Sequence, residues 1–285
     1  MALSDTTQVK QLIAQALAED LGWGDVTTEA LVPDTQQGKA SIIAKARGTI
    51  AGVEVAKQVF LKVDPRLKMD ILVKDGTEVK LRDVIARIEG KTSNILKAER
   101  VALNFLQHLS GIASETARYV QAVKGLPVSI TDTRKTIPGL RTLEKYAVQI
   151  GGGKNHRMHL GDGVLIKDNH LAALRNQGIR IQEVIARARQ KAPKKLRVEI
   201  EVKTIEEAIE AAESGADLIM LDNMNLKDMR QAVQLIKGSA LTEASGGITL
   251  DRVRAVAETG VNLISVGALT HSAKALDISL ELELA

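Results

Sequence analysis

LRVEIEVKTIEEAIEAAESGADLIMLDN, which spans residues 196–223, contains the pattern from which the architecture of this chain can be predicted. It holds two short apolar runs, and the segment between them, Ile205 to Ser214, has apolar residues at helical spacing. Apolar strands that alternate with amphipathic helices are typical of a parallel sheet that is covered on both faces. We therefore predict a strand–helix–strand unit in which Glu201 and Asp222 stand at the carboxyl ends of the two strands.

The same rhythm extends over the second half of the chain. Six short apolar runs with polar or glycine-rich ends follow Gly125: VSITDTRK, GVLIKDNH, LRVEIEVK, DLIMLDN, ALTEASGG and LISVGAL. Other helix-like segments cover residues 182–190, 227–236 and 250–259. About six such units predict a closed or nearly closed α/β barrel, in which sites lie at the carboxyl ends of the strands. A doubly wound open sheet is the alternative, but it would gather ligand residues at one switch point, and here nearly every strand end is polar.

The first half of the chain has a different pattern. Apolar residues at helical spacing predict a helix over Val9–Leu21, and Gly22 is a suitable stop. From Lys39 to about Gly90, short apolar runs are divided by Gly and Asp, which indicates strands and turns. Asp75–Gly76 is a turn signal within this region.

A long helix is predicted over residues 91–125, with Ser93 or Asn94 as its N-terminal cap. Its predicted buried face consists of Ile95, Ala98, Ala102, Phe105 and Leu109.

The bulk composition excludes several classes of protein. The 285 residues are 45% hydrophobic and 26% charged, which is ordinary for a globular protein. Aromatic residues make up only 2% and the net charge is only +4, so the chain is poorly suited to nucleic acid or an anionic membrane. The lack of cysteine excludes disulfides and thiolate chemistry and fits a reducing compartment. We expect a cytoplasmic protein without a signal peptide or a membrane span.

A cluster of cations is the strongest functional signal. TDTRKTIPGLRTLEKYAVQIGGGKNHRMHLGDGVLIKDNH, residues 131–170, places Arg134, Lys135, Arg157 and Lys167 at or near the ends of predicted strands. Arginine binds carboxylate or phosphate through a fixed fork, and lysine supplies a compact charge. Surface cations with acidic partners are the alternative for any single residue. Four together at strand ends indicate a pocket for a ligand with several negative charges.

Two carboxylates add to this signal. Glu201 and Asp222 suit Mg²⁺ held through a phosphorylated ligand, because Mg²⁺ keeps several waters and uses few protein oxygens. The alternative is that they pair with Lys167 or Lys135, and a shifted register would replace Glu201 by Glu199.

EASGG at residues 243–247 and SVGAL at residues 265–269 precede helix-like segments and could bind a phosphate through main-chain N–H groups. Ordinary tight turns are the alternative. The histidines form no zinc motif: His156 could donate to an anion, whereas His159 and His170 are expected to be structural.

Several long motifs together resemble one family. They are GDVTTEAL at residues 24–31, ERVALNFLQHLSGIAS at 99–114, the segment 132–170, LDN at 221–223, EASGGI at 243–248 and ISVGALTH at 264–271. Over nearly the whole chain these motifs are similar to the quinolinate phosphoribosyltransferases, also called nicotinate-nucleotide pyrophosphorylases (carboxylating).

The resemblance implies a reaction and an architecture. The family transfers phosphoribosyl from phosphoribosyl pyrophosphate (PRPP) to quinolinate with loss of pyrophosphate and CO₂, giving nicotinate mononucleotide for de novo NAD biosynthesis, with Mg²⁺. The implied fold has an N-terminal α/β sandwich domain over residues 1–110, which includes much of the long helix and is joined by the C-terminal tail 271–285. An incomplete, about six-stranded α/β barrel would cover residues 111–270. A homodimer with shared active sites is implied, and a higher oligomer is conceivable.

The resemblance also assigns roles to residues. Quinolinate would be held by Arg134, His156, Arg157 and Lys167, with Thr133 in the same substrate-binding set. Lys135 and Lys167 would lie near the leaving pyrophosphate, and Glu201 and Asp222 would contact the ribose hydroxyls and Mg²⁺. Lys135, Lys167, Glu201 and Asp222 are the implied catalytic set. The 5′-phosphate would lie in a cradle made of Glu243, Ala244, Ser245, Gly246, Ile264, Ser265, Val266 and Gly267. Arg100 resembles an arginine that reaches quinolinate across the dimer interface.

Two other functions remain open at this stage. A homologous nicotinate or molybdate-operon-type phosphoribosyltransferase would use another acceptor, but a monocarboxylate acceptor needs fewer cations. A non-catalytic phosphosugar-binding barrel is the second alternative, and the presence of both Glu201 and Asp222 argues against it.

Overall fold

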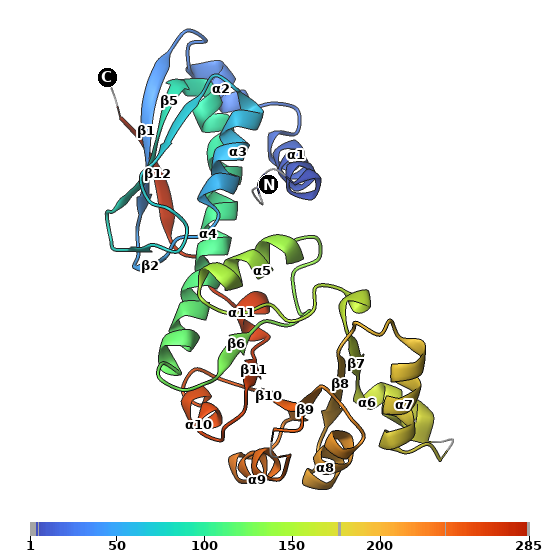
Figure 1. Cartoon of the computed structure of the whole chain (residues 1–285). Helices are drawn as coiled ribbons and strands as arrows, with labels where there is room; N and C mark the ends of the chain where they lie inside the picture. Colours follow the sequence, from blue (N-terminus) through green and yellow to red (C-terminus); the bar gives the residue numbers. More distant parts are fainter. Residues whose placement is uncertain (1–3, 5, 176–177, 237, 284–285) are drawn as a thin grey trace. The chain divides into compact units, whose positions relative to one another are not determined.

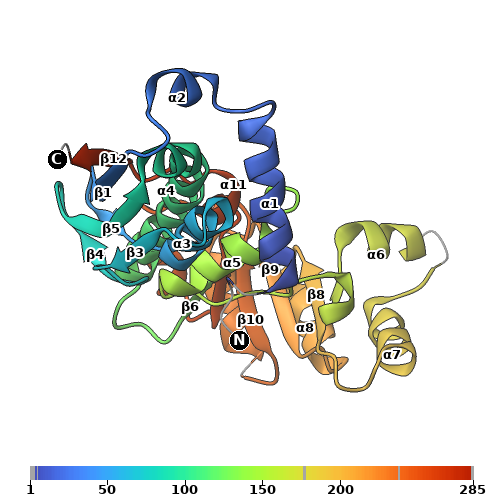
Figure 2. The same ribbon diagram turned by 90° about the horizontal axis from the view of Figure 1, so that it is seen from above.

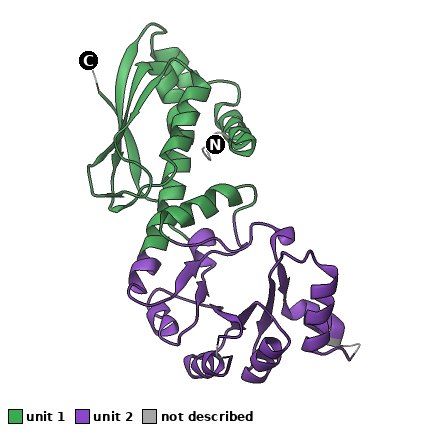
Figure 3. Cartoon of the chain, viewed as in Figure 1, with its two compact units in different colours: residues 1–117, 137–152, 272–285 green, residues 118–136, 153–271 purple. Residues whose placement is uncertain are grey.

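The computed structural model describes residues 4, 6–175, 178–236 and 238–283. The chain divides into two compact units, which Figure 3 shows in green and purple. Unit 1 comprises residues 1–117, 137–152 and 272–285, and unit 2 comprises residues 118–136 and 153–271. The last two residues of the predicted tail 271–285 lie outside the described residues.

Unit 1 contains a four-stranded antiparallel sheet with the order β12-β1-β5-β3. These strands are β1 (Gln37–Ala44), β3 (Lys68–Ile71), β5 (Val84–Lys91) and β12 (Ile278–Glu283). A small second sheet pairs β2 (Gly48–Thr49) with β4 (Glu78–Val79). Figures 1 and 2 both show α3 (Val53–Val63) and α4 (Thr92–Ala122) on one side of the larger sheet. This arrangement is an α/β sandwich.

Helix α3 corrects the prediction of strands and turns throughout residues 39–90. Its buried apolar residues recur at helical spacing, but its β-branched composition resembles that of the flanking strands. The Asp75 carboxylate accepts the main-chain N–H groups of Gly52 and of the first residue of α3, at 2.8 and 3.0 Å. A negative charge at a helix N-terminus is favourable. The predicted turn is confirmed, with Gly76 at φ 87°, and it also supplies this cap.

The predicted N-terminal helix is confirmed as α1 (Thr7–Leu21), which ends at Gly22 with φ 47°. The long helix α4 is also present, but it begins at Thr92, so Ser93 and Asn94 lie inside its first turn and are not its caps. The Asn94 amide instead donates to the Asp64 carboxylate at 2.7 Å. Two further helices of unit 1 are α2 (Val26–Leu31) and α5 (Arg141–Ile150).

Unit 2 contains all six predicted strands in one parallel sheet with the order β6-β11-β10-β9-β8-β7. They are β6 (Ser129–Thr131), β7 (Val164–Ile166), β8 (Val198–Val202), β9 (Leu218–Asp222), β10 (Leu241–Ser245) and β11 (Leu263–Ser265). This order runs round without the reversal of a doubly wound sheet. Within the described ranges β6 and β7 do not pair with each other, so the barrel is incomplete.

The helices of unit 2 are α6 (Asp168–Arg175), α7 (Ile181–Lys191), α8 (Ile205–Glu213), α9 (Leu226–Ile236), α10 (Val253–Ala257) and α11 (Ala268–His271), with a short 3₁₀ turn at Leu160–Asp162. Helices such as α8 and α9 lie on the outer side of this sheet, and the short α11 lies at its carboxyl-end side (Figure 1). The predicted helix over residues 250–259 is shorter than expected, because a turn closed by the Arg252 N–H and the Thr249 carbonyl precedes α10.

Alternation along the strands determines what faces the barrel interior. Val198, Ile200 and Val202 of β8 are fully buried, whereas Glu199 and Glu201 face the other way. The two glutamates are two residues apart, so they share a face at successive levels. Glu201 lines the cavity at the carboxyl ends of the strands, so the alternative in which Glu199 replaces it does not apply.

The segment after α5 extends the sheet beyond β6. Lys154 bridges Thr131 in parallel, its N–H donates to the Ile130 carbonyl at 2.8 Å, and its carbonyl accepts the Asp132 N–H at 3.2 Å. This short extension positions the nearby residues His156 and Arg157, which follow Asn155. Separately, none of the helices in the described ranges is both long enough and apolar enough to span a bilayer.

Candidate active site

A cavity of about 340 Å³ lies at the carboxyl ends of the strands of unit 2. Its lining consists of Thr133, Arg134, Lys135, His156, Arg157, Leu165, Lys167, Glu201, Met220, Asp222, Glu243, Ser245 and Ser265. Apart from Leu165 and Met220, each of these was predicted from the sequence. Residues from six separate strand ends thus meet at one cavity, as the barrel prediction requires.

Other predicted residues do not line this cavity. Ala244, Ile264 and Val266 are buried, and their side chains alternate with those that face the interior. Only their main chain could reach a ligand. The Val266 N–H already donates to the Thr131 carbonyl at 2.9 Å.

The two cradle glycines lie where little space is left for a side chain. A Cβ atom on Gly246, which has φ 95°, would lie 2.3 Å from the Asn223 Oδ1 atom. A Cβ on Gly267 would lie 3.1 Å from the Lys135 Cδ atom. The positive φ and the close Asn223 contact favour glycine at position 246, and at both positions main chain lies close to side chains of neighbouring strand ends. Arg100 lies on α4 in unit 1, where its side chain is exposed.

Arg134 and Arg157 bring two positive charges close together in the cavity wall. The pKa of Arg157 is lowered, first by burial and then by the charge of Arg134, while Glu199 opposes the shift. The Arg157 guanidinium donates to the Gly163 carbonyl at 3.0 Å, which fixes its orientation. An anion that contacts both guanidinium groups would favour the charged form of Arg157.

Hydrogen bonds hold the two lysines on their loops. The Lys135 N–H donates to the Thr133 hydroxyl at 3.0 Å, and the Lys135 carbonyl accepts the Thr270 hydroxyl of α11 at 2.7 Å. The Lys167 N–H donates to His170 Nδ1 at 2.8 Å, so His170 has a structural contact, as expected. These bonds use the main chain and leave the ammonium groups to the cavity.

Glu201 and Asp222 form a pair of like charges on adjacent strands. The pKa of Glu201 is raised, first by burial and then by Asp222 and Asp168. The charge of Lys167 opposes this shift, as the alternative of a Lys167 partner would require, but within the described ranges no ion pair joins either acid to Lys135 or Lys167. Closely placed carboxylates with only oxygen donors match the preference of Mg²⁺. These two residues are therefore the ones that could hold that ion.

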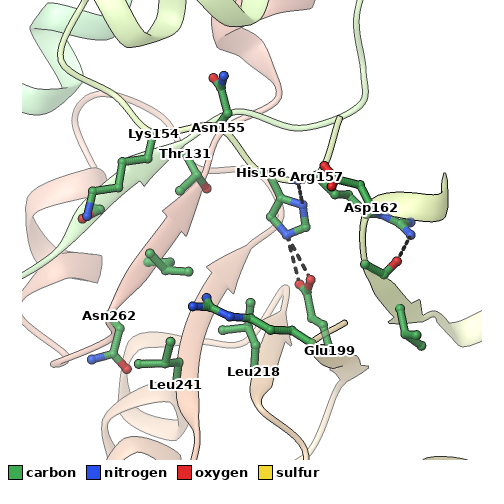
Figure 4. A pocket seen from close by; sticks show the side chains of 15 residues that line it. Thr131, Lys154, Asn155, His156, Arg157, Asp162, Glu199, Leu218, Leu241 and Asn262 are labelled. Atoms are coloured by element: carbon green, nitrogen blue, oxygen red, sulfur yellow. Dashed lines mark hydrogen bonds and ion pairs between the residues drawn. The ribbon is translucent and has the colours of Figure 1, made fainter. Parts of the chain in front are cut away.

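His156 is bound on both ring nitrogens by the protein. Its Nδ1 accepts the Arg157 N–H at 2.9 Å, and its Nε2 lies 3.0 Å from Glu199 Oε2 (Figure 4). The main-chain N–H of His156 donates to Asp132 at 2.8 Å. Sequence analysis missed Asp132 and treated Glu199 only as a substitute for Glu201. The available signal was the acid–apolar–acid spacing of β8, which places both glutamates on one face.

A second cavity, of about 520 Å³, lies towards the amino ends of the same strands (Figure 4). It shares His156 and Arg157 with the first cavity and is also lined by Lys154, Arg197 and Asn262. Although this cavity is larger, the cations and acids predicted to act together do not gather there. The carboxyl-end cavity is therefore the better candidate for chemistry.

Comparison with known proteins identifies the family of this chain. Residues 25–110 match the family described as quinolinate phosphoribosyl transferase, N-terminal domain, and residues 112–281 match its C-terminal domain. A probable nicotinate-nucleotide pyrophosphorylase (carboxylating) of Bacillus subtilis is 44% identical over 97% of this chain and 94% of its own length. A mitochondrial quinolinate phosphoribosyltransferase (decarboxylating) of Nicotiana glauca is 43% identical over 98% of this chain and 83% of its own length.

Solved structures give the same result. NadC from Streptococcus pyogenes superposes with a TM-score of 0.93 at 43% identity and covers 98% of both chains. The nicotinate-nucleotide pyrophosphorylase from Francisella tularensis has a TM-score of 0.91 at 36% identity and covers 99% of both chains. This chain, in both of its domains, therefore belongs to the quinolinate phosphoribosyltransferase family.

Proposed function

We propose that this protein transfers the phosphoribosyl group of PRPP to quinolinate, releases pyrophosphate and CO₂, and forms nicotinate mononucleotide in de novo NAD biosynthesis. Membership of the family supports the reaction, and the printed names of its relatives describe the same chemistry. The observation that carries the proposal is the cavity at the carboxyl ends, where four cations meet the acids Glu201, Asp222 and Glu243.

The cations suit a ligand with two carboxylates. Arg134 and Arg157 can each form a two-pronged contact with a carboxylate, and Lys167 adds a point charge. His156 has both ring nitrogens engaged, so its part is to hold Arg157 and the cavity floor in place. Lys135, with Lys167, is the cation that would face the leaving pyrophosphate.

The chemistry needs orientation and electrostatic stabilisation more than proton transfer. The quinolinate nitrogen attacks C1 of PRPP while the bond from C1 to the pyrophosphate oxygen breaks, and positive charge develops on the ribose ring. Glu201 and Asp222 can stabilise that charge through the ribose hydroxyls. The bond from C2 to the carboxylate then breaks, CO₂ leaves, and the electron pair stays on C2 beside the pyridinium nitrogen until a proton is added.

Mg²⁺ is part of the proposal, with Glu201 and Asp222 as the residues that would hold it. When bound, the ion would offset the negative charge of the leaving pyrophosphate. The 5′-phosphate is assigned to the loops after β10 and β11, where the Ser245 and Ser265 hydroxyls line the cavity and Gly246 and Gly267 permit close main-chain approach.

The purified protein is expected to form nicotinate mononucleotide and pyrophosphate from quinolinate and PRPP, and to release one CO₂ for each product molecule. Chromatography of the nucleotide and capture of CO₂ from quinolinate labelled at the 2-carboxylate would measure this, with and without Mg²⁺. Nicotinate serves as the alternative acceptor. Comparable turnover of nicotinate would contradict the dicarboxylate assignment, and binding of PRPP without pyrophosphate release would contradict catalysis.

The proposal includes a homodimer in which Arg100 of one subunit completes the site of the other. Each of the variants Arg100→Ala and Lys135→Ala is expected to be inactive alone, whereas a mixture should recover part of the activity, because one mixed site keeps both side chains. Heterodimers carrying two different tags can be isolated and assayed. Isolated heterodimers without activity would argue against a shared site. A cytoplasmic location and a higher oligomer remain predictions.

A further inference from the structure

Glu243 is a fully buried carboxyl group. It lies on β10 in the wall of the candidate active site, and its side chain is 0% exposed to solvent. Neither carboxylate oxygen accepts a hydrogen bond from any residue in the described ranges. Leaving an ionised carboxylate in such a place costs several kcal/mol, so burial favours the neutral acid.

The groups that face Glu243 from neighbouring elements are mostly acidic. Glu199 of β8 and Asp132, just after β6, are both acids, and His156 Nε2 lies 3.6 Å from Glu243 Oε2. The Ser265 hydroxyl of β11 also faces Glu243 and lowers its pKa, although by geometry its hydrogen bond goes to the Ala244 carbonyl at 3.5 Å. The cations in the same cavity wall are Arg134, Lys135, Arg157 and Lys167.

A metal ion does not fit this cluster, although the spacing alone would allow one. One atom each of His156, Glu199 and Glu243 lies within 4.8 Å of the others. His156 Nδ1, however, accepts the Arg157 N–H, so the neutral ring carries its proton on Nε2. That nitrogen then donates to Glu199 and has no lone pair for a metal.

The balance of these groups places the proton affinity of Glu243 in the neutral range. Burial, followed by the charge of Glu199, raises the pKa of Glu243 to about 7, while His156 acts in the opposite direction. Around neutral pH the empty site therefore contains both the acid and the carboxylate form of this residue.

We propose that Glu243 takes up a proton when the dicarboxylate substrate binds in this cavity, so that substrate affinity is linked to pH. A dianion in the cavity adds negative charge near a carboxyl group that has no donor of its own, and the neutral acid is then the favoured form. By linkage, binding weakens as the pH rises through the range in which the empty protein loses this proton. The inference rests on the proposed function, because it takes quinolinate as the ligand.

Calorimetry of the whole protein with quinolinate measures this uptake directly. Titrations at about pH 7.5, in buffers that differ in ionisation enthalpy, should show uptake of a large fraction of one proton per site. Between about pH 7 and pH 9 the dissociation constant should rise by up to about tenfold per pH unit. Glu243→Gln, which imitates the neutral acid, should bind quinolinate with little proton uptake and a nearly flat pH dependence.

The exposed Glu206 of α8 provides a matched control, since Glu206→Gln removes a carboxylate outside the cavity and should behave as the wild type. Infrared difference spectra of the wild type give a second measurement that needs no variant to fold. Quinolinate should increase the absorption of protonated carboxyl groups.

Quinolinate binding without proton uptake in the wild type would overturn the inference and leave the proposed function intact. Uptake that persists in Glu243→Gln would assign the proton to another group and overturn it as well. Absence of quinolinate binding would overturn the proposed function together with the inference.

Discussion

Arg157→Ala is expected to raise the KM for quinolinate by about 30- to 900-fold, which corresponds to roughly 2–4 kcal/mol for a lost charge-assisted contact. The KM for PRPP should change far less. The reason is the placement of the guanidinium, which is partly buried beside Arg134 and has its charge disfavoured there until an anion arrives. Arg134→Ala should show the same selectivity. Steady-state kinetics with each substrate varied in turn would measure both effects.

Two controls separate this role from a structural one. Arg157 also donates to the Gly163 carbonyl, so alanine could disturb the loop before β7. Arg157→Lys keeps a positive charge but lacks the fork, and it should recover only part of the affinity. Arg230→Ala removes an exposed arginine of α9 and should leave both KM values unchanged. If the two substrates weakened equally in Arg157→Ala, the division of labour between the cations would be wrong.

Asp222→Asn is expected to lower kcat by about 100- to 1000-fold, comparable to the loss of one group that stabilises transition-state charge. The substitution preserves the shape of the side chain and removes the negative charge that lies beside Glu201 at the ends of β8 and β9. Both proposed tasks of the pair, at the ribose hydroxyls and at Mg²⁺, need that charge. The Mg²⁺ concentration for half-maximal activity should therefore rise in the same variant.

Titration of Mg²⁺ against initial rate, at saturating quinolinate and PRPP, would measure both quantities. The exposed Asp70 of β3 offers a matched substitution, because Asp70→Asn removes the same charge from unit 1. An unchanged kcat in Asp222→Asn, with the Mg²⁺ requirement unaltered, would contradict the assignment of this acid.

The barrel could be predicted because its signal is local. Each strand is a short apolar run, and the parallel pairing follows from the helices between them, so the side chains at the strand ends could be expected to meet. Helix α5 was missed because its sequence carries several charged residues, yet Glu144 and Lys145 are completely buried. The Glu144 Oε1 atom lies 2.9 Å from Nε2 of His108, a residue that is distant in the sequence.

The raised pKa of Glu243 could not be predicted either, because the groups that cause it are distant from it in the sequence. Its sequence neighbours suggested a phosphate loop, and that expectation considered only its position before Gly246. Its unusual proton affinity comes from β8 and from the short extension beyond β6, which contribute Glu199 and His156. Periodicity shows which face a side chain takes, whereas the groups that it meets there depend on how distant strands are placed side by side.

The incomplete barrel has a consequence for how the substrate is held. Lys167 follows β7 and Arg134 follows β6, and within the described ranges these two edge strands share no hydrogen bonds. An anion that contacts both cations would span the seam where the backbone ladder stops. A bound anionic substrate would then hold the two edge strands of the open barrel together electrostatically, where no backbone hydrogen bonds join them in the part of the chain that the structure describes.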